Sequence, residues 1–166
     1  MEILKLNSYS PEQTQLLGSL LGELAQSGDI FLLTGDLGTG KTCLTQGIAQ
    51  GLGIKEYAFS PSFVIIREYH GRLPLYHIDF YRLDNIDEIA DLGLEEYFYS
   101  KGVCVIEWAE KGLPILPQEN LLIALNYVSH SETERTIYFT SKEKRYLELI
   151  KRLKIKMQKS KCKLSF

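Results

Sequence analysis

The spacing of apolar residues in the first third of the chain predicts a strand, a helix, a second strand and a second helix. Residues 2–6 alternate loosely between apolar and polar, which is typical of a short strand. Leucines then recur at helical spacing behind Ser10 and Pro11, which suit the cap and the first position of a helix. Residues 29–34 are almost all apolar and indicate a strand buried on both faces. A second helix is expected over residues 41–52.

The rest of the pattern predicts a hairpin, short helices, a second buried strand, a closing antiparallel pair and a last helix. The hairpin is expected at residues 63–69 and 73–79, and the short helices at 85–99. The second buried strand is expected at 103–106, and the antiparallel pair at 121–128 and 135–140. A stripe of apolar residues at helical spacing predicts the last helix, and consists of Tyr146, Leu149, Ile150, Leu153 and Met157. No internal repeat or linker divides the chain, which favours a single domain.

Composition is typical of a globular protein in a reducing compartment. Apolar residues make up 45% and charged residues 24% of the 166 residues, enough to bury one core. No apolar run approaches the roughly 18–20 residues that cross a bilayer, and the N-terminus lacks a signal-peptide pattern. The three cysteines, Cys43, Cys104 and Cys162, share no CxxC spacing, which argues against a disulfide framework or a zinc site. We therefore expect a cytoplasmic protein that does not associate with membranes.

Charge is distributed unevenly along the chain, although the net formal charge is only −2. Residues 142–166 carry ten Lys or Arg residues and two acidic ones, so this tail has a formal charge of +8 and the rest of the chain −10. The tail could meet RNA or another acidic partner, but the favoured interpretation is a solvated end that keeps the chain soluble.

A glycine-rich segment between the second strand and the second helix carries the strongest chemical signal. It fits the phosphate-binding pattern GxxxxGK[ST] at every fixed position and consists of Gly35, Asp36, Leu37, Gly38, Thr39, Gly40, Lys41 and Thr42. Glycines permit positive φ angles, so that successive backbone amides converge on an anion, and the following helix adds its positive N-terminal end. Lys41 is expected to reach the β- and γ-phosphates, and the Thr42 hydroxyl to ligate Mg²⁺.

P-loop enzymes pair this loop with a carboxylate at the end of another buried strand, which holds Mg²⁺ directly or through water. Glu107 ends the all-apolar run at 103–106 and is the favoured metal residue. Asp79 also ends a strand, and is then expected to support the metal or to orient the attacking water. The sequence leaves the reverse assignment of these two acids open.

The neighbours of these residues are ambiguous. Trp108 directly follows Glu107 and is suited to pack against nucleotide, a protein partner or the core. Cys43 follows Thr42 and is expected at the nucleotide as a small packing residue rather than a nucleophile. The three histidines, His70, His77 and His130, have no metal-ligand spacing and are interpreted as structural or surface residues.

The sequence resembles the TsaE family, also called YjeE, of bacterial tRNA threonylcarbamoyladenosine biosynthesis. Four landmarks match in order: the loop at 35–42, Ser-Pro-Ser-Phe at 60–63, His-Ile-Asp-Phe-Tyr-Arg-Leu at 77–83 and Ile-Glu-Trp at 106–108. Thr14 and Gly18 in the first helix also look familial, and the likeness covers roughly residues 1–140. Two features depart from the family pattern. Ser62 replaces a Thr but keeps a hydroxyl, and the basic tail after Lys142 is not expected from the family.

The resemblance implies an α/β, three-layer P-loop NTPase fold with a mostly parallel central sheet plus antiparallel strands. Residues 1–141 would form the P-loop ATPase domain, with residues 142–166 as the C-terminal helix and basic tail of the same domain. It further implies a Mg-dependent ATPase, slow without its partners. In that scheme the ATP cycle serves a complex with TsaD and TsaB, which place threonylcarbamoyl on the adenosine following the anticodon. The chain then meets tRNA indirectly through the complex, and the sequence leaves a direct tRNA contact open.

Site roles carry over from the same resemblance by motif. Lys41, Asp79 and Glu107 would be catalytic, and Thr42 and Glu107 would hold the metal. Cys43, Trp108 and Arg135 would join the loop in binding nucleotide, with Arg135 the weakest match.

Two other classes of protein compete with this interpretation. A small-molecule P-loop kinase shares the loop and the size, but it usually closes an Arg-rich lid over the phosphates, whereas residues 84–96 are acidic. A nucleotide-sensing adaptor would bind ATP and hardly turn it over. A signalling GTPase is disfavoured because no Asn-Lys-x-Asp guanine-reading motif occurs in the sequence.

Overall fold

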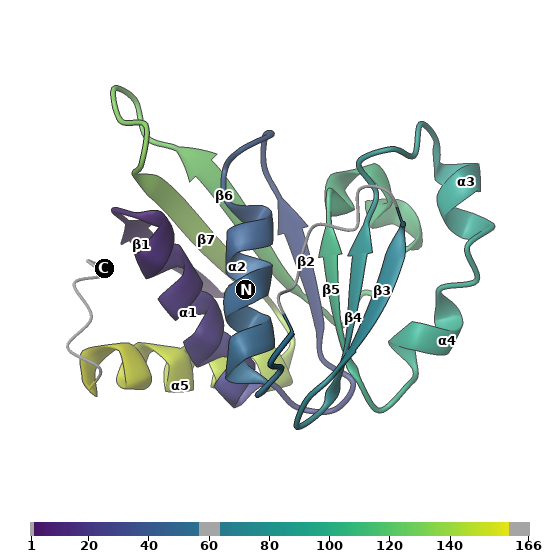
Figure 1. The fold of residues 1–166 in the computed structure, drawn as a ribbon, viewed down its shortest axis with the longest axis horizontal. Coiled ribbons are helices and arrows are strands. Elements are labelled where there is room, and N and C mark those ends of the chain that lie inside the picture. Colours follow the sequence, from purple (N-terminus) through teal and green to yellow (C-terminus); the bar gives the residue numbers. More distant parts are fainter. Residues whose placement is uncertain (1, 57–63, 160–166) are drawn as a thin grey trace.

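Seven strands form one twisted sheet in the computed structural model, which describes residues 2–56 and 64–159 (Figure 1). The strands are β1 (Glu2–Ser8), β2 (Ile30–Thr34), β3 (Ile66–His70), β4 (Pro74–Asp79), β5 (Val103–Glu107), β6 (Leu121–Tyr127) and β7 (Arg135–Ser141). Their order across the sheet is β1-β7-β6-β2-β5-β4-β3. All of the predicted strands are confirmed, with ends that differ by a few residues. The predicted start of the hairpin at Phe63 lies outside the described residues.

Parallel pairing is confined to the middle of the sheet. β6, β2, β5 and β4 run parallel, whereas β1 and β7 on one side and β3 on the other pair antiparallel. The predicted mostly parallel centre with added antiparallel strands is therefore confirmed. Because the carboxyl ends of parallel strands meet at one edge of a sheet, Thr34, Asp79 and Glu107 are brought to the same edge.

Helices cover both faces of this sheet and produce three layers (Figure 1). They are α1 (Pro11–Leu24), α2 (Lys41–Gly51), α3 (Ile86–Ala90), α4 (Glu95–Phe98) and α5 (Lys144–Lys159), with two short 3₁₀ turns at Ala109–Lys111 and Leu113–Ile115. Successive residues of β2 show why two layers are needed. Phe31 and Leu33 pack in the core under α1, α2 and α5, and Ile30 and Leu32 pack in a second core under α3 and α4.

Helices α1 and α2 approach each other more closely than side chains normally permit. A Cβ atom on Gly47 would lie 2.0 Å from the carbonyl oxygen of Gln15, and one on Gly18 would lie 2.2 Å from that of Leu44. Gly22 and Gly51 repeat these contacts one turn further along each helix. The missing side chains therefore let the two backbones touch, which fixes α2 against α1 over about two turns.

Helix α5 is attached to the amino ends of the central strands by polar contacts as well as its apolar stripe. Arg145 forms a two-pronged ion pair with the buried carboxylate of Asp29, at 3.0 Å and 2.5 Å. The Tyr146 hydroxyl accepts a hydrogen bond from the Ile30 amide at 2.8 Å. Burial raises the pKa of the Asp29 carboxyl, and its hydrogen bonds with Arg145 oppose that rise. The predicted last helix is confirmed, with its apolar stripe buried as expected.

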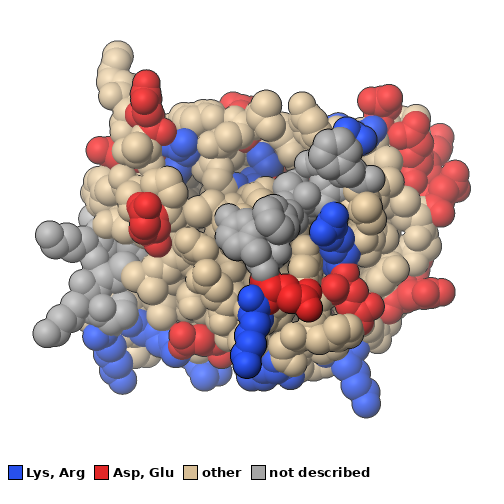
Figure 2. Space-filling model, viewed as in Figure 1, with Lys and Arg blue, Asp and Glu red and all other residues tan. Residues whose placement is uncertain are grey.

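Charged side chains separate to different parts of the surface. Lys and Arg gather along the lower edge of the molecule, including the part over α5, whereas acidic side chains gather over α3 and α4 (Figure 2). In the described part of the chain, no helix combines the length and the apolar character needed to cross a membrane.

The close contact between α1 and α2 generates the first prediction. Replacing Gly47 with Ala should lower the free energy of unfolding by about 1–3 kcal/mol, because the added methyl group must push the two backbones apart. Urea denaturation measures the change. Gln50→Ala, at an exposed position of the same helix, should stay within about 0.5 kcal/mol of the parent. Equal stabilities for the two variants would contradict the contact.

Candidate functional site

The loop at residues 35–42 joins the carboxyl end of β2 to the start of α2. Gly35, Gly38 and Gly40 have φ angles of 135°, 78° and 103°, in the region that side chains disfavour. Gly40 is also the N-cap of α2, and its carbonyl accepts from the Leu44 amide at 2.9 Å. Positive φ angles and a helix N-terminus together make a concave group of amides that favours anions.

Side chains from β6 and β7 hold this loop from outside. The Tyr127 hydroxyl donates to the Leu37 carbonyl at 2.5 Å. The Arg135 guanidinium donates to the carbonyls of Thr39 and Gly38 at 3.1 Å and 3.2 Å, and it lies 4.5 Å from the centroid of the Tyr127 ring. Arg135, predicted at the nucleotide, therefore contacts the loop backbone in this structure. Tyr127 is a supporting residue that the sequence reasoning missed.

Lys41 lies across the mouth of the loop. Its ammonium donates to the carbonyls of Gly35 and Asp36, the latter at 2.8 Å, and lies 4.0 Å from the centroid of the Trp108 ring. Burial lowers the pKa of Lys41, and the nearby carboxylates, Glu107 first among them, oppose this shift. The side chain is thus placed where a bound phosphate chain would replace carbonyl oxygens as its partner.

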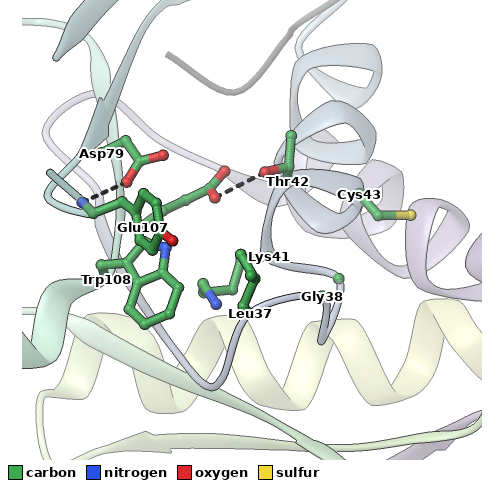
Figure 3. A pocket seen from close by; sticks show the side chains of 10 residues that line it. Leu37, Gly38, Lys41, Thr42, Cys43, Asp79, Glu107 and Trp108 are labelled. Atoms are coloured by element: carbon green, nitrogen blue, oxygen red, sulfur yellow. Dashed lines mark hydrogen bonds between the residues drawn. The ribbon is translucent and has the colours of Figure 1, made fainter. Parts of the chain in front are cut away.

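The two predicted carboxylates lie side by side, because Asp79 and Glu107 are paired residues of β4 and β5. Glu107 is buried and accepts a hydrogen bond from the Thr42 hydroxyl at 2.9 Å (Figure 3). It also accepts from the Thr45 hydroxyl at 3.1 Å. Asp79 accepts from the Tyr81 amide at 2.8 Å. Thr42 and Glu107 were the predicted metal pair, and the structure brings their side chains into direct contact.

His77 is a third partner of Glu107. The sequence identified it as a structural or surface residue and did not predict this contact. It is fully buried on β4, and its Nε2 lies 2.7 Å from Oε1 of Glu107. Because a carboxylate only accepts, Nε2 carries the hydrogen and donates it. The other ring nitrogen, Nδ1, has no hydrogen-bond partner within the described part of the chain. The spacing His-x-Asp on a strand was the available signal, since it puts His77 and Asp79 on one face.

Trp108 has an unusual backbone and forms one wall of the site. Its φ angle of 57° lies in the left-handed region, which a bulky residue rarely adopts. Its ring lies 5.0 Å from that of Tyr81, and both side chains line the site. Strained conformations of this kind persist where the surrounding structure fixes them, and they are common at functional sites.

Two clefts flank the loop. The first, of about 320 Å³, is lined by Leu37, Gly38, Gly40, Lys41, Thr42, Cys43, Asp79, Tyr81, Glu107 and Trp108. The second, of about 220 Å³, is lined by Pro11, Thr14, Gly38, Thr39, Gly40, Cys43, Thr133 and Arg135. Cys43 borders both clefts and donates to the Pro11 carbonyl at 3.1 Å. Burial raises the pKa of its thiol, which agrees with a packing role. The predicted residues 60–63 lie outside the described part of the chain.

The oxygen groups at the first cleft fit a magnesium nucleotide. Mg²⁺ prefers hard oxygen ligands and is usually held by one or two carboxylates together with substrate phosphates and water. Glu107, Asp79 and the Thr42 hydroxyl supply such oxygens beside the anion-binding loop. Among the described residues, no group of three or more His, Cys, Asp or Glu side chains forms an all-protein metal site.

Comparisons with known proteins agree with this geometry. The family model described as threonylcarbamoyl adenosine biosynthesis protein TsaE matches residues 8–137. The tRNA threonylcarbamoyladenosine biosynthesis protein TsaE of Bacillus subtilis is 46% identical over 154 residues, which cover 92% of this chain and 95% of that protein. Its namesake in Treponema pallidum is 42% identical over 130 residues, covering 78% and 96%. The crystal structure of Bacillus subtilis YdiB superposes with a TM-score of 0.81 at 42% identity, covering 93% of this chain and 96% of that one.

The contact between His77 and Glu107 generates the second prediction. Replacing His77 with Phe should lower the free energy of unfolding by about 1–3 kcal/mol, because the buried carboxylate loses one of its donors. Tyr69→Phe is a matched control. That buried hydroxyl has no partner among the described residues, so its removal breaks no hydrogen bond and should not lower the free energy of unfolding. Thermal or urea unfolding compares the two variants, and a larger loss in the control would refute the assignment.

Proposed function

Because this chain belongs to the TsaE family, we propose that it serves tRNA threonylcarbamoyladenosine biosynthesis as a subunit that binds Mg–ATP and hydrolyses it. The observation that carries the proposal is one cleft in which Lys41, Thr42 and Glu107 meet at a loop of converging amides. Lysine, hydroxyl and carboxylate have different tasks in phosphoryl transfer, and all three kinds of group line this cleft beside the loop.

The triphosphate would lie along the P-loop. Its oxygens would accept from the loop amides and from the N-terminus of α2, whose positive end favours negative charge. Lys41 would exchange the carbonyls of Gly35 and Asp36 for the β- and γ-phosphates. This exchange keeps the ammonium hydrogen-bonded in both states and adds charge complementarity in the bound one.

Thr42 and Glu107 would hold Mg²⁺. The ion would neutralise the negative charge that develops on the phosphates. Glu107 is itself positioned by Thr45 and His77, so that its carboxylate is fixed before any ligand arrives. Asp79, the paired residue on β4, would accept a hydrogen bond from the attacking water at the same edge of the sheet and so orient that water. Trp108, stacked over Lys41, would limit access of bulk water to the phosphates.

The second cleft would take the nucleoside, because it lies on the other flank of the same loop. Its walls come from the start of α1, at Pro11 and Thr14, and from the β6–β7 side, at Thr133 and Arg135. Adenine is the expected base, since the chain has no Asn-Lys-x-Asp guanine-reading motif.

The partners proposed are TsaD and TsaB, with tRNA reached through that complex and the cytoplasm as the compartment. In this arrangement the chain resets or regulates the complex and does not transfer the threonylcarbamoyl group. Turnover alone should be slow and should rise when the partner proteins are added. A small-molecule kinase is the alternative, and phosphate release in the absence of any acceptor molecule separates the two, because a kinase needs the acceptor.

Lys41→Ala tests the phosphate contact. Loss of the ammonium should weaken ATP binding by about 1.5–3 kcal/mol, the usual size of a charge-assisted hydrogen bond. Calorimetry on the folded variant measures the change. Unchanged affinity would remove Lys41 from the nucleotide site.

Glu107→Gln and Asp79→Asn test the two carboxylates. Glu107→Gln should fold and should lower Mg²⁺-dependent turnover roughly 10–100-fold, because a charged oxygen beside the metal becomes a neutral amide. Asp79→Asn should slow hydrolysis and leave ATP binding almost unchanged. Steady-state rates over a magnesium titration distinguish the roles. If only Asp79→Asn shifts the magnesium dependence, the two assignments are reversed.

A further inference from the structure

Helix α5 exposes a row of basic side chains to solvent. Its apolar stripe faces the core, and the opposite side exposes Lys144, Lys151, Arg152 and Lys159. These positions are separated by seven, one and seven residues, which places them on one face of a helix. In the described part of the chain, none of the four forms an ion pair. We call these four residues the basic row.

Other basic residues of the same helix have structural partners, which sets the basic row apart. Arg145 is paired with the buried carboxylate of Asp29, and Lys156 is paired with Glu23 on α1. These contacts attach α5 to the body and leave little freedom for it to move away. The basic row is therefore a surface held in place by the fold, and not a loose run of charge.

The basic row lies at the opposite end of the sheet from the nucleotide site. Helix α5 contacts the amino end of β2 through Asp29 and Ile30, whereas the P-loop follows the carboxyl end of that strand (Figure 1). A partner on α5 would not block the P-loop, so both can be occupied together.

The family model does not include α5. It matches residues 8–137 and ends before α5 begins at Lys144. The Bacillus relative and YdiB cover 92% and 93% of this chain, so their similarity extends into α5. The phosphate-binding loop and both carboxylates lie within the family model, whereas the exposed charge of α5 lies beyond it and calls for a separate explanation.

We propose that the basic row is an RNA-binding surface that contacts the phosphate backbone of tRNA directly. RNA is the polyanion that the family's named biosynthetic role supplies. The row spans about 22 Å from Lys144 to Lys159 at roughly 1.5 Å per helical residue, enough to reach several consecutive phosphates. An acidic protein is a poorer fit, because cations distributed along one exposed helix face match an extended phosphate backbone. The proposal is independent of ATP hydrolysis.

One acidic residue interrupts the basic row, and its replacement provides a second, independent test of RNA binding. Glu148 is exposed on the same face, one turn from Lys144 and from Arg152. It should repel phosphate, so its replacement should strengthen RNA binding, whereas replacement of the basic row should weaken it. Opposite effects from neighbouring residues of one helix are hard to produce by unfolding.

The experiment is filter binding of tRNA to the full chain across a salt series. The test variant carries Gln at all four positions of the basic row. The matched control carries Gln at Lys5, Lys55, Arg67 and Lys101, which are also three lysines and one arginine, exposed elsewhere on the molecule. Both variants lose the same formal charge. ATP affinity is measured in parallel and should be unchanged in both, which separates this result from any failure of the nucleotide proposal.

If the basic row makes four phosphate contacts, tRNA affinity of the parent should fall about a hundredfold between 50 mM and 200 mM salt. The slope of log affinity against log salt should be lower by about 3 in the test variant and nearly unchanged in the control. Glu148→Gln should tighten binding severalfold at the lower salt concentration. Superimposable curves for test and control variants, or no tRNA binding by the parent at 50 mM salt, would overturn the proposal. Loss of an acidic protein partner with tRNA binding intact would also overturn it.

Discussion

The arrangement of the site depends on one buried carboxylate. Glu107 ends the central strand β5, where water is excluded, so each of its oxygens must find a protein donor. It finds them on two different elements: Thr42 and Thr45 on α2, and His77 on β4. A carboxylate that is satisfied only when a helix and a neighbouring strand are both in place ties the two together. The P-loop follows from this constraint, because α2 begins where the loop ends.

The loop is then held by its own supports on the other side. Tyr127 and Arg135 are paired residues of β6 and β7, and both contact loop carbonyls. The loop is therefore enclosed between the Glu107 contacts and this antiparallel pair. A binding site with both flanks fixed needs little rearrangement to accept phosphate, which reduces the entropy lost on binding. The added antiparallel strands thus have a function in the site, in addition to closing the sheet.

Local pattern was enough to predict the strands, most helices and the residues at the cleft, because motif and strand context agree over residues 35–42 and 103–108. The partners of those residues were harder to predict. His77 was interpreted as structural or surface, because its contact with Glu107 joins strands 30 residues apart in sequence. Tyr127 and the carbonyl contacts of Arg135 depend on hairpin register, which apolar spacing does not determine. Gly18 and Gly47 are visible in the sequence, but their contact exists only after the two helices have packed.

The glycine contact between α1 and α2 has a mechanical consequence. The second cleft has one wall on α1, at Pro11 and Thr14, and its floor on the loop that begins α2. Since the two helices touch backbone to backbone, that wall and that floor keep their relative position, and the angle between them is set before ligand arrives. The space between α1 and the loop therefore limits the size of the group that can enter there. Ligand-driven motion is left to the remaining walls, which are Thr133 and Arg135 on the β6–β7 side and Asp79 and Trp108 at the ends of β4 and β5.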